Sequence, residues 1–289
     1  MAARPWRRRL AWVGAGVALL AAVSWGGGAL RWQARTAALH RGLDGVRDHQ
    51  PATTYDEREL ADLPPVVQRY FRAVLRPGQP MVLAARLAQR GTINLADRGE
   101  SWQPFSAVHH VATSPPGFVW DAVVTMAGFV PLRVHDAYVR HGGVTDAALF
   151  GLLPLASQRG TGAAAMAQLV RYLAEAPWYP TALLPSQGVH WRAVDDRRAE
   201  ATLVDGDTSV TATFTFADGG HIAAVQVTAR GRTVGDTLVP TPWGGRFAEP
   251  VRCDGMLVPR CAEVFWQLPA GEHVYWRGEV ERIDYEWWR

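Results

Sequence analysis

Residues 189–230 decide the fold class and read VHWRAVDDRRAEATLVDGDTSVTATFTFADGGHIAAVQVTAR. Four segments of this stretch, Val189–Val194, Ala199–Val204, Thr208–Phe216 and Ile222–Arg230, are separated by short runs of aspartate, arginine and glycine. Such polar and glycine-containing turns join adjacent antiparallel strands. The stretch therefore predicts an antiparallel meander.

The strand pattern extends to both sides of this meander. Apolar and polar residues alternate from residue 82 onward, and residues 118–124 are apolar on both faces, as in a central strand covered on both sides. Two further strands are predicted at Glu263–Leu268 and Val274–Tyr285. We therefore predict a mainly β (α+β) fold, with a large curved antiparallel sheet, shaped like a half-barrel, around one central packed helix.

That central helix is predicted at Ala163–Glu175, and Pro177 ends it. Its apolar residues recur at the spacing of one buried helix face: Met166, Leu169, Val170 and Leu173. A second helix begins at Leu63-Pro64-Pro65, because proline suits the first helical turn, and carries an apolar stripe as far as Leu75.

An uncharged segment near the N-terminus, residues 10–30, follows four arginines at positions 4, 7, 8 and 9. A run of about 20 apolar residues can span a bilayer, and flanking arginines hold their end in the cytoplasm. The sequence thus predicts a single-pass anchor in the cytoplasmic (inner) membrane, with the C-terminal domain extracytoplasmic. A cleaved signal peptide is the alternative, although it would have a shorter apolar centre and a small-x-small cleavage site.

These patterns divide the chain into three parts. Residues 1–35 comprise a basic cytoplasmic stub and the transmembrane anchor, residues 36–81 a helical linker, and residues 82–289 the extracytoplasmic β-rich domain. The sequence Pro77-Gly78-Gln79-Pro80 marks the boundary of the last part.

The net charge of +3 arises from the anchor's flank. Without those four arginines, 26 basic residues face 27 acidic ones, so the basicity gives no reason to expect a nucleic-acid partner. The only cysteines, Cys253 and Cys261, lie outside the membrane in this topology, and we predict that they form a disulfide. Two cysteines without further ligands make a poor zinc site, and we predict neither a metal nor another cofactor.

The sequence shows no nucleophile elbow, phosphate-binding loop, zinc-binding H-E-x-x-H or dinucleotide motif. No catalytic residue is therefore assigned, and we expect a binding protein more than an enzyme. The most distinctive stretch is Arg171–Leu184, in which Arg171 and Glu175 are i, i+4 neighbours on a helix. They form either a surface ion pair or the wall of a pocket roofed by Trp178.

Asp136 is a second unusual residue, because alternation places its carboxylate on the same strand face as Leu132, Val134 and Tyr138. A carboxylate on an apolar face needs a partner or a shifted pKa, and an arginine such as Arg171 would pair with it. The candidate ligand-pocket residues are Trp120, Asp136, Tyr138, Arg171, Glu175 and Trp178.

These motifs carry a resemblance to known proteins. Trp102-Gln103-Pro104-Phe105, Pro116–Trp120, Asp136-x-Tyr138, Arg171–Leu184 and Glu263–Trp266 resemble an uncharacterised bacterial family, known only as a domain of unknown function behind one N-terminal membrane helix. The resemblance covers residues 63–285 and brings no established catalytic residue. The architecture is also similar to that of periplasmic lipoprotein carriers of the LolA and LppX type, with Gly255–Pro259 resembling one of their strands.

The pattern as a whole favours a membrane-tethered extracytoplasmic protein that binds a lipid, a lipoprotein acyl chain or another apolar ligand in the concave face of its sheet. Nine of the thirteen tryptophans lie beyond residue 35. Two alternatives stay open: an envelope hydrolase that uses Asp136 or Glu175, and a non-catalytic assembly partner in the envelope.

Overall fold

One antiparallel sheet of thirteen strands dominates the computed structural model, which describes residues 26–45, 53–96, 99–235 and 237–288. The strands are β1 (Val82–Asn94), β2 (Trp102–Thr113), β3 (Pro116–Met126), β4 (Val130–Val139), β5 (Gly142–Leu149), β6 (Leu153–Gly160), β7 (Val189–Ala193), β8 (Arg198–Asp205), β9 (Thr208–Phe216), β10 (Ile222–Val234), β11 (Thr237–Cys253), β12 (Met256–Leu268) and β13 (Gly271–Trp287). Their order is β6-β5-β4-β3-β2-β1-β13-β12-β11-β10-β9-β8-β7.

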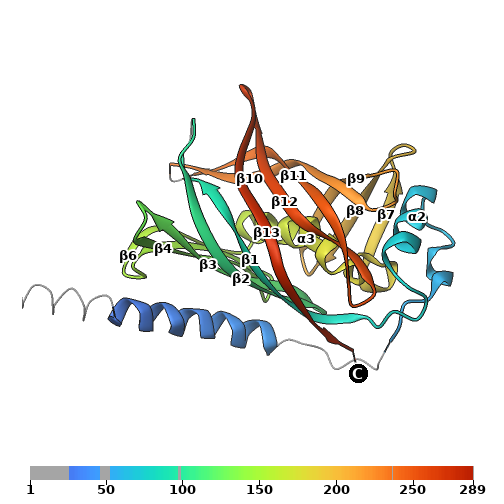
Figure 1. The fold of residues 1–289 in the computed structure, drawn as a ribbon, viewed down its shortest axis with the longest axis horizontal. Coiled ribbons are helices and arrows are strands. Elements are labelled where there is room, and N and C mark those ends of the chain that lie inside the picture. Colours follow the sequence, from blue (N-terminus) through green and yellow to red (C-terminus); the bar gives the residue numbers. More distant parts are fainter. Residues whose placement is uncertain (1–25, 46–52, 97–98, 236, 289) are drawn as a thin grey trace, which may run out of the picture.

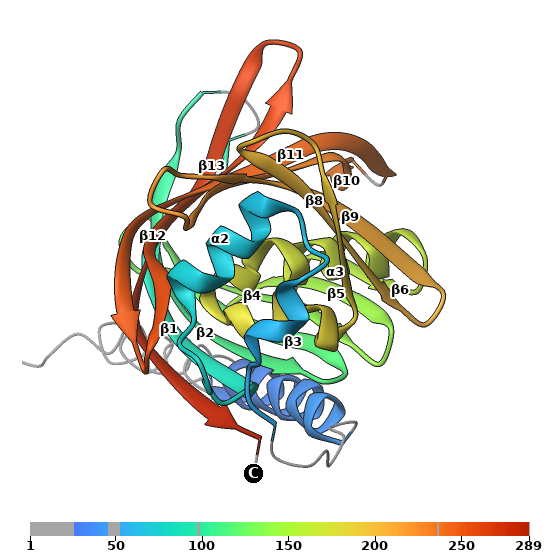
Figure 2. The same cartoon turned by 90° about the vertical axis from the view of Figure 1, so that its right-hand side faces the viewer.

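In this order, the meander β1–β6 and the meander β7–β13 are joined by pairing between the first strand, β1, and the last strand, β13. β1 pairs with β13 from Val82 opposite Trp287 to Ile93 opposite Trp276. The sheet curls around the helix α3 (Ala163–Glu175), as Figures 1 and 2 show. The mainly β, curved antiparallel architecture and the meander at residues 189–230 are thus confirmed, and the sheet is open, with β6 and β7 at its edges.

Strand β11 is missing from the sequence prediction. It contains Pro240, Pro242 and Pro250, which are unusual inside a sheet because proline donates no backbone hydrogen bond. Gly244 in this strand lets β10 and β12 pack closely against it: a Cβ atom at Gly244 would lie 2.8 Å from the Phe265 ring and from the Val225 carbonyl oxygen. Because of these prolines and glycines the sequence pattern does not indicate a strand here, and the pairing of β11 is set by its neighbours β10 and β12.

Helix α3 and the turns after it fill the concave side of the sheet. Three 3₁₀ turns follow the helix: η2 (Ala176–Trp178), η3 (Pro180–Leu183) and η4 (Pro185–Gln187). Leu169, Val170 and Leu173 are buried as predicted, but Met166 is 48% exposed. Met166 lies in the first turn, at the exposed end of the helix.

The segment predicted as a helical linker, residues 36–81, contributes to the main core. It contains η1 (Glu57–Leu60) and α2 (Pro65–Val74), and Figures 1 and 2 together show α2 at one end of the curled sheet, beside β7. Tyr70 and Phe71 are buried, and the Tyr70 ring lies 5.6 Å from the ring of Phe216 in β9. Burial of this apolar stripe makes the part around α2 an integral piece of the domain.

A helix at residues 26–44 lies along the convex side of β2–β4 (Figure 1). Leu43 packs with Ala112, Val119 and Ala137 in a small core of its own. This cover explains why β3 is apolar on both faces, as predicted. The predicted anchor, residues 10–30, lies mostly outside the described residues. Among the residues that are described, no helix is long and apolar enough to cross a membrane.

The predicted disulfide is wrong, since Cys253 and Cys261 are both free thiols. Cys253 stands opposite Met256 at the β11–β12 turn, whereas Cys261 stands opposite Ala248. Met256 and Cys261 are five residues apart in β12, or about 17 Å at the rise of an extended strand. The Cα atoms of a disulfide lie at most about 7 Å apart, so the hairpin register keeps these thiols separate.

Candidate functional site

A cavity of about 270 Å³ lies between α3 and the concave face of the sheet. Its wall is mainly apolar and rich in aromatic rings, among them Trp120, Trp178, Trp243, Trp276 and Phe247. A more open hollow of about 850 Å³ shares Phe247, Ala262 and Glu263 with this wall. The curl of the sheet brings side chains from eight strands and α3 to one enclosed apolar space.

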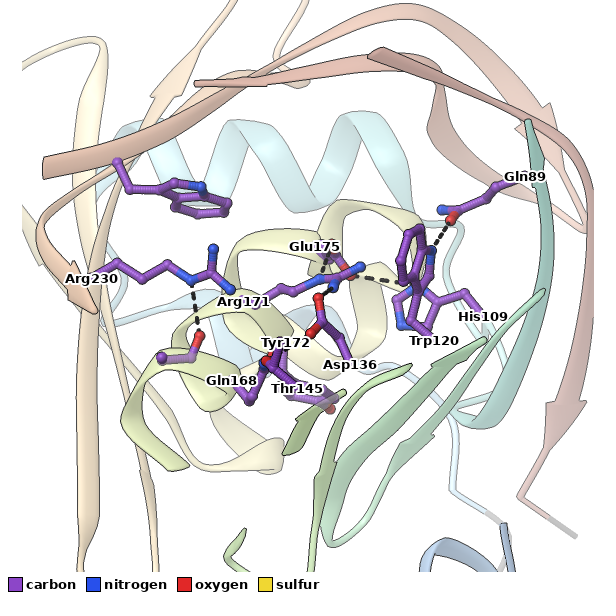
Figure 3. A network of polar contacts seen from close by, with 12 residues as sticks. Gln89, His109, Trp120, Asp136, Thr145, Gln168, Arg171, Tyr172, Glu175 and Arg230 are labelled. Atoms are coloured by element: carbon purple, nitrogen blue, oxygen red, sulfur yellow. Dashed lines mark hydrogen bonds and ion pairs between the residues drawn. The ribbon is translucent and has the colours of Figure 1, made fainter. Parts of the chain in front are cut away.

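Arg171 of α3 is the central charge in this wall (Figure 3). Its Nη1 donates to Asp136 Oδ2 at 2.6 Å, and its Nε donates to Glu175 Oε1 at 2.7 Å. The three side chains are only 11%, 19% and 14% exposed. The guanidinium also lies 5.0 Å from the centre of the Trp120 ring, a distance that permits a cation–π contact. The arginine is thus buried with two carboxylates around it.

Burial and charge act in opposite directions on this cluster. Burial lowers the pKa of Arg171, but the Glu175 and Asp136 carboxylates outweigh it and raise that pKa, so the guanidinium stays charged. Burial raises the pKa of Glu175, and the opposing charge of Arg171 does not cancel the shift. Burial therefore disfavours the charge on Glu175.

His109 stands beside Glu175 and is fully buried (Figure 3). Its Nδ1 lies 3.5 Å from Glu175 Oε2, and neither ring nitrogen has a hydrogen-bond partner among the described residues. Burial, followed by the charge of Arg171, places the pKa of His109 well below its usual 6.5. The imidazole is therefore neutral at physiological pH.

Asp136 has polar partners besides Arg171. The Thr145 hydroxyl donates to Asp136 Oδ1 at 2.7 Å, and Gln168 Nε2 donates to the Thr145 hydroxyl at 2.8 Å. Both carboxylate oxygens are thus occupied. Chemically, this arrangement holds a charge in place on an apolar wall, and it does not present a free base.

Five of the six residues proposed from the sequence line the cavity, namely Trp120, Asp136, Arg171, Glu175 and Trp178. Of the two interpretations of Arg171 and Glu175, the structure has the pocket wall and not the surface pair. Tyr138 lies apart from them: it is fully buried two residues beyond Asp136, and its hydroxyl donates to Asp205 at 2.6 Å.

Arg230 and Trp243 are wall residues that the sequence did not reveal. Trp243 belongs to β11, the strand that the sequence did not predict. Arg230 follows a β-bulge, because Val227 pairs with Trp243 but Arg230 pairs with Thr241. One extra residue in β10 shifts the alternation and brings Arg230 to the concave face. Only the pairing register could have shown this.

No group of three histidine, cysteine, aspartate or glutamate side chains suited to a metal ion occurs in the described part of the chain. Fold and site together define a class: a curled antiparallel sheet that encloses an apolar cavity with a buried charge cluster. The chain belongs to a family of unknown function, DUF6920, whose profile matches residues 61–285. The predicted membership of an uncharacterised family is thus confirmed. No curated protein matches the sequence.

Three bacterial proteins of known structure are among those similar to this chain. A candidate outer membrane lipoprotein-sorting protein domain from Vibrio parahaemolyticus is 8% identical, with a TM-score of 0.39, and the match covers 70% of this chain and 85% of that one. A LolA superfamily protein from Nitrosomonas europaea is 14% identical, with a TM-score of 0.32 and coverages of 76% and 91%. A β-barrel-like protein of unknown function from Brucella abortus is 12% identical, with a TM-score of 0.16 and coverages of 72% and 100%.

Proposed function

We propose that this protein is a membrane-tethered, extracytoplasmic binder of a lipid or another amphiphile, whose apolar part occupies the cavity beside α3. The observation that carries the proposal is the cavity itself, which is concave, lined with tryptophan and about 270 Å³ in volume. Small-molecule sites are usually concave and mostly apolar, with a few placed polar groups. Arg171, Asp136 and Arg230 are such groups here.

The volume suggests how much ligand fits. A water molecule takes up about 30 Å³ of liquid, and a methylene group is about as large, so the cavity holds roughly nine such groups. That is one alkyl chain of medium length, or the end of a longer one. The adjoining hollow of about 850 Å³ gives a longer chain somewhere to continue.

The position of the helix at residues 26–44 supports a particular orientation. Its first turns touch the β5–β6 turn, where a Cβ atom at Gly28 would lie 2.5 Å from the Phe150 carbonyl oxygen. The Phe150 N–H donates to the Pro131 carbonyl at 2.9 Å, so the β3–β4 turn is a neighbour. Phe129 in that turn is 77% exposed, and Leu153 at the start of β6 is 60% exposed. If residues 10–30 form the anchor, this apolar rim faces the bilayer from which a lipid would come.

The charge cluster favours binding over hydrolysis. A general base must be free to reach the proton it removes, but Asp136 is held by Arg171 and Thr145. Glu175 shares the same arginine and faces His109 across 3.5 Å. These contacts give the carboxylates a structural role in the cavity wall.

A neutral apolar dye, N-phenyl-1-naphthylamine, tests the proposal on the full-length chain in peptidiscs. We expect saturable fluorescence enhancement, lost in Ala147→Phe, because Ala147 lines the cavity and a phenyl ring would fill it. Ala193→Phe is the matched control, since Ala193 is exposed on the edge strand β7. Equal dye binding by both variants and the parent would overturn the proposal. Activity of an extracytoplasmic reporter fused after Arg289 tests the orientation, and activity of a cytoplasmic reporter at that place would contradict it.

A further inference from the structure

Arg230 lies between two cavities of different character. It lines the apolar cavity beside α3, and it also lines a second cavity of about 180 Å³. The second cavity has mainly polar side chains in its wall, including Thr145, Gln168 and Thr233. Tyr275 and Asp136 belong to both walls as well, and the Asp136 carboxylate is already paired with Arg171. An apolar space and a polar space that meet at one arginine match the two ends of an amphiphile.

Arg230 forms no ion pair with a carboxylate in the described part of the chain, although its charge acts on the more distant Glu175. Arg171, on the same cavity wall, differs because it contacts two carboxylates directly. Arg230 is held instead by neutral groups. Its Nε donates to the Ala167 carbonyl at 3.0 Å (Figure 3), and its guanidinium lies 4.9 Å from the centre of the Trp243 ring. The protein thus fixes a half-buried cation without a direct ion pair to a described carboxylate.

Tyr275 supplies a second donor at the same place. Its hydroxyl oxygen accepts from Trp243 Nε1 at 3.0 Å and lies 3.5 Å from Arg230 Nη1. Both neighbours are donors, so the hydroxyl proton of Tyr275 has no acceptor among the described residues. Arg230 and Tyr275 therefore form a pair of donors directed to one missing acceptor.

Gln168 gives an independent sign of a missing polar group. It is 3% exposed and lines the polar cavity, and its Nε2 is committed to the Thr145 hydroxyl. Its Oε1 is buried and has no hydrogen-bond partner among the described residues. Buried acceptors are almost always satisfied, so a ligand hydroxyl or a water held by the ligand is expected here.

We propose that Arg230 and Tyr275 bind the anionic head group, carboxylate or phosphate, of a single-chain amphiphile, whose alkyl chain lies in the apolar cavity toward Trp120 and Trp178. This inference rests on the proposed function and adds the chemical class of the ligand. Guanidinium groups form charge-assisted hydrogen bonds with carboxylates and phosphates, often in pairs. Room for roughly nine methylene-sized groups is enough for one alkyl chain of medium length.

Matched brominated probes test the assignment, because bromine quenches tryptophan on contact and tryptophans line the apolar cavity. We would titrate the full-length chain in peptidiscs with 11-bromoundecanoate, 11-bromoundecyl phosphate and the uncharged 11-bromoundecanol. Arg230→Gln should weaken binding of the anionic probes at least about tenfold, since it removes charge-assisted hydrogen bonds. The alcohol should keep its affinity within about threefold, which also shows that the variant is folded. Arg230→Lys should fall between Gln and the parent.

Arg232→Gln is the matched control, because it removes the same charge two residues further along β10 and Arg232 lines neither cavity. It should leave all three probes unchanged. The anionic probe that loses more affinity in Arg230→Gln identifies the head group as carboxylate or phosphate. Equal binding of acid and alcohol, unchanged in Arg230→Gln, would overturn the head-group assignment and leave the apolar cavity as a binding site. Absence of quenching by any probe would instead refute the proposed function, and this inference with it.

Discussion

Replacing Arg171 should destabilise the protein more than replacing either of its carboxylate partners. Arg171→Met keeps most of the apolar side chain but leaves Asp136 and Glu175 close together, 19% and 14% exposed, without their cation. Breaking a buried ion pair in this way costs about 3–5 kcal/mol. For a domain of this size each kcal/mol lowers the melting temperature by about 2–4 °C, so we expect a loss of roughly 6–20 °C.

The partners should follow in a defined order. Asp136→Asn leaves Arg171 paired with Glu175 and keeps an acceptor for Thr145, so it should cost about 1–3 kcal/mol. Glu175→Gln should cost least, because burial raises the pKa of Glu175 and already disfavours its charge. The Arg171→Met/Asp136→Asn double variant should lose less than the sum of the single variants, since both break the same contact.

Thermal unfolding followed by circular dichroism on the full-length chain measures this series. Arg192→Met is the control, because Arg192 is 72% exposed in its pair with Glu200, and surface pairs contribute about 0–1 kcal/mol. If Arg171→Met and Asp136→Asn melt within about one degree of the parent, the buried pair does not stabilise the fold and the reasoning is wrong.

Three further predictions concern other parts of the molecule. Burial keeps the pKa of His109 well below 6.5, so the unfolded chain binds its proton first, and the free energy of unfolding should fall below pH 6.5 by up to about 1.4 kcal/mol per pH unit. His109→Gln should make this fall shallower in acid titrations, and an unchanged slope would refute the assignment. Cys253 and Cys261 should both react with maleimide in denatured, unreduced protein, whereas two unreactive cysteines would support the disulfide predicted from the sequence. Leu43→Asp should expose the helix at residues 26–44 to proteolysis, because Leu43 is 2% exposed against Val119, and unchanged cleavage would show that this contact does not hold the helix.

The elements that could be predicted from the sequence are those with a local pattern. The meander β7–β10 has alternation and polar turns, and α3 has an apolar face and a proline stop. The contact between Asp136 and Arg171 could be anticipated because a carboxylate on an apolar strand face needs a cation. For the meander and the helix, the physical requirement lies within a few residues of the signal, and for Asp136 the need for a partner is local although the partner is 35 residues away.

The features that could not be predicted depend on strand register. The bulge before Arg230 changes which face the side chain occupies, and nothing in residues 222–230 marks it. The prolines and glycines of β11 are untypical of a strand, so this strand follows from its pairing with neighbouring strands and not from its own sequence pattern. Likewise, the spacing of Cys253 and Cys261 suggested a closed loop, whereas the register of the β11–β12 hairpin sets the two thiols far apart. Register arises from pairing across the whole sheet, which a local pattern does not contain.

Native mass spectrometry of the full-length chain, purified from its own membrane, tests the central claim most directly. We predict that the parent carries one single-chain anionic amphiphile per molecule and that Ala147→Phe carries none, because the new ring occupies the apolar cavity. A parent chain that shows only its own mass, or a ligand that Ala147→Phe retains in full, would contradict the assignment of this cavity as the binding site.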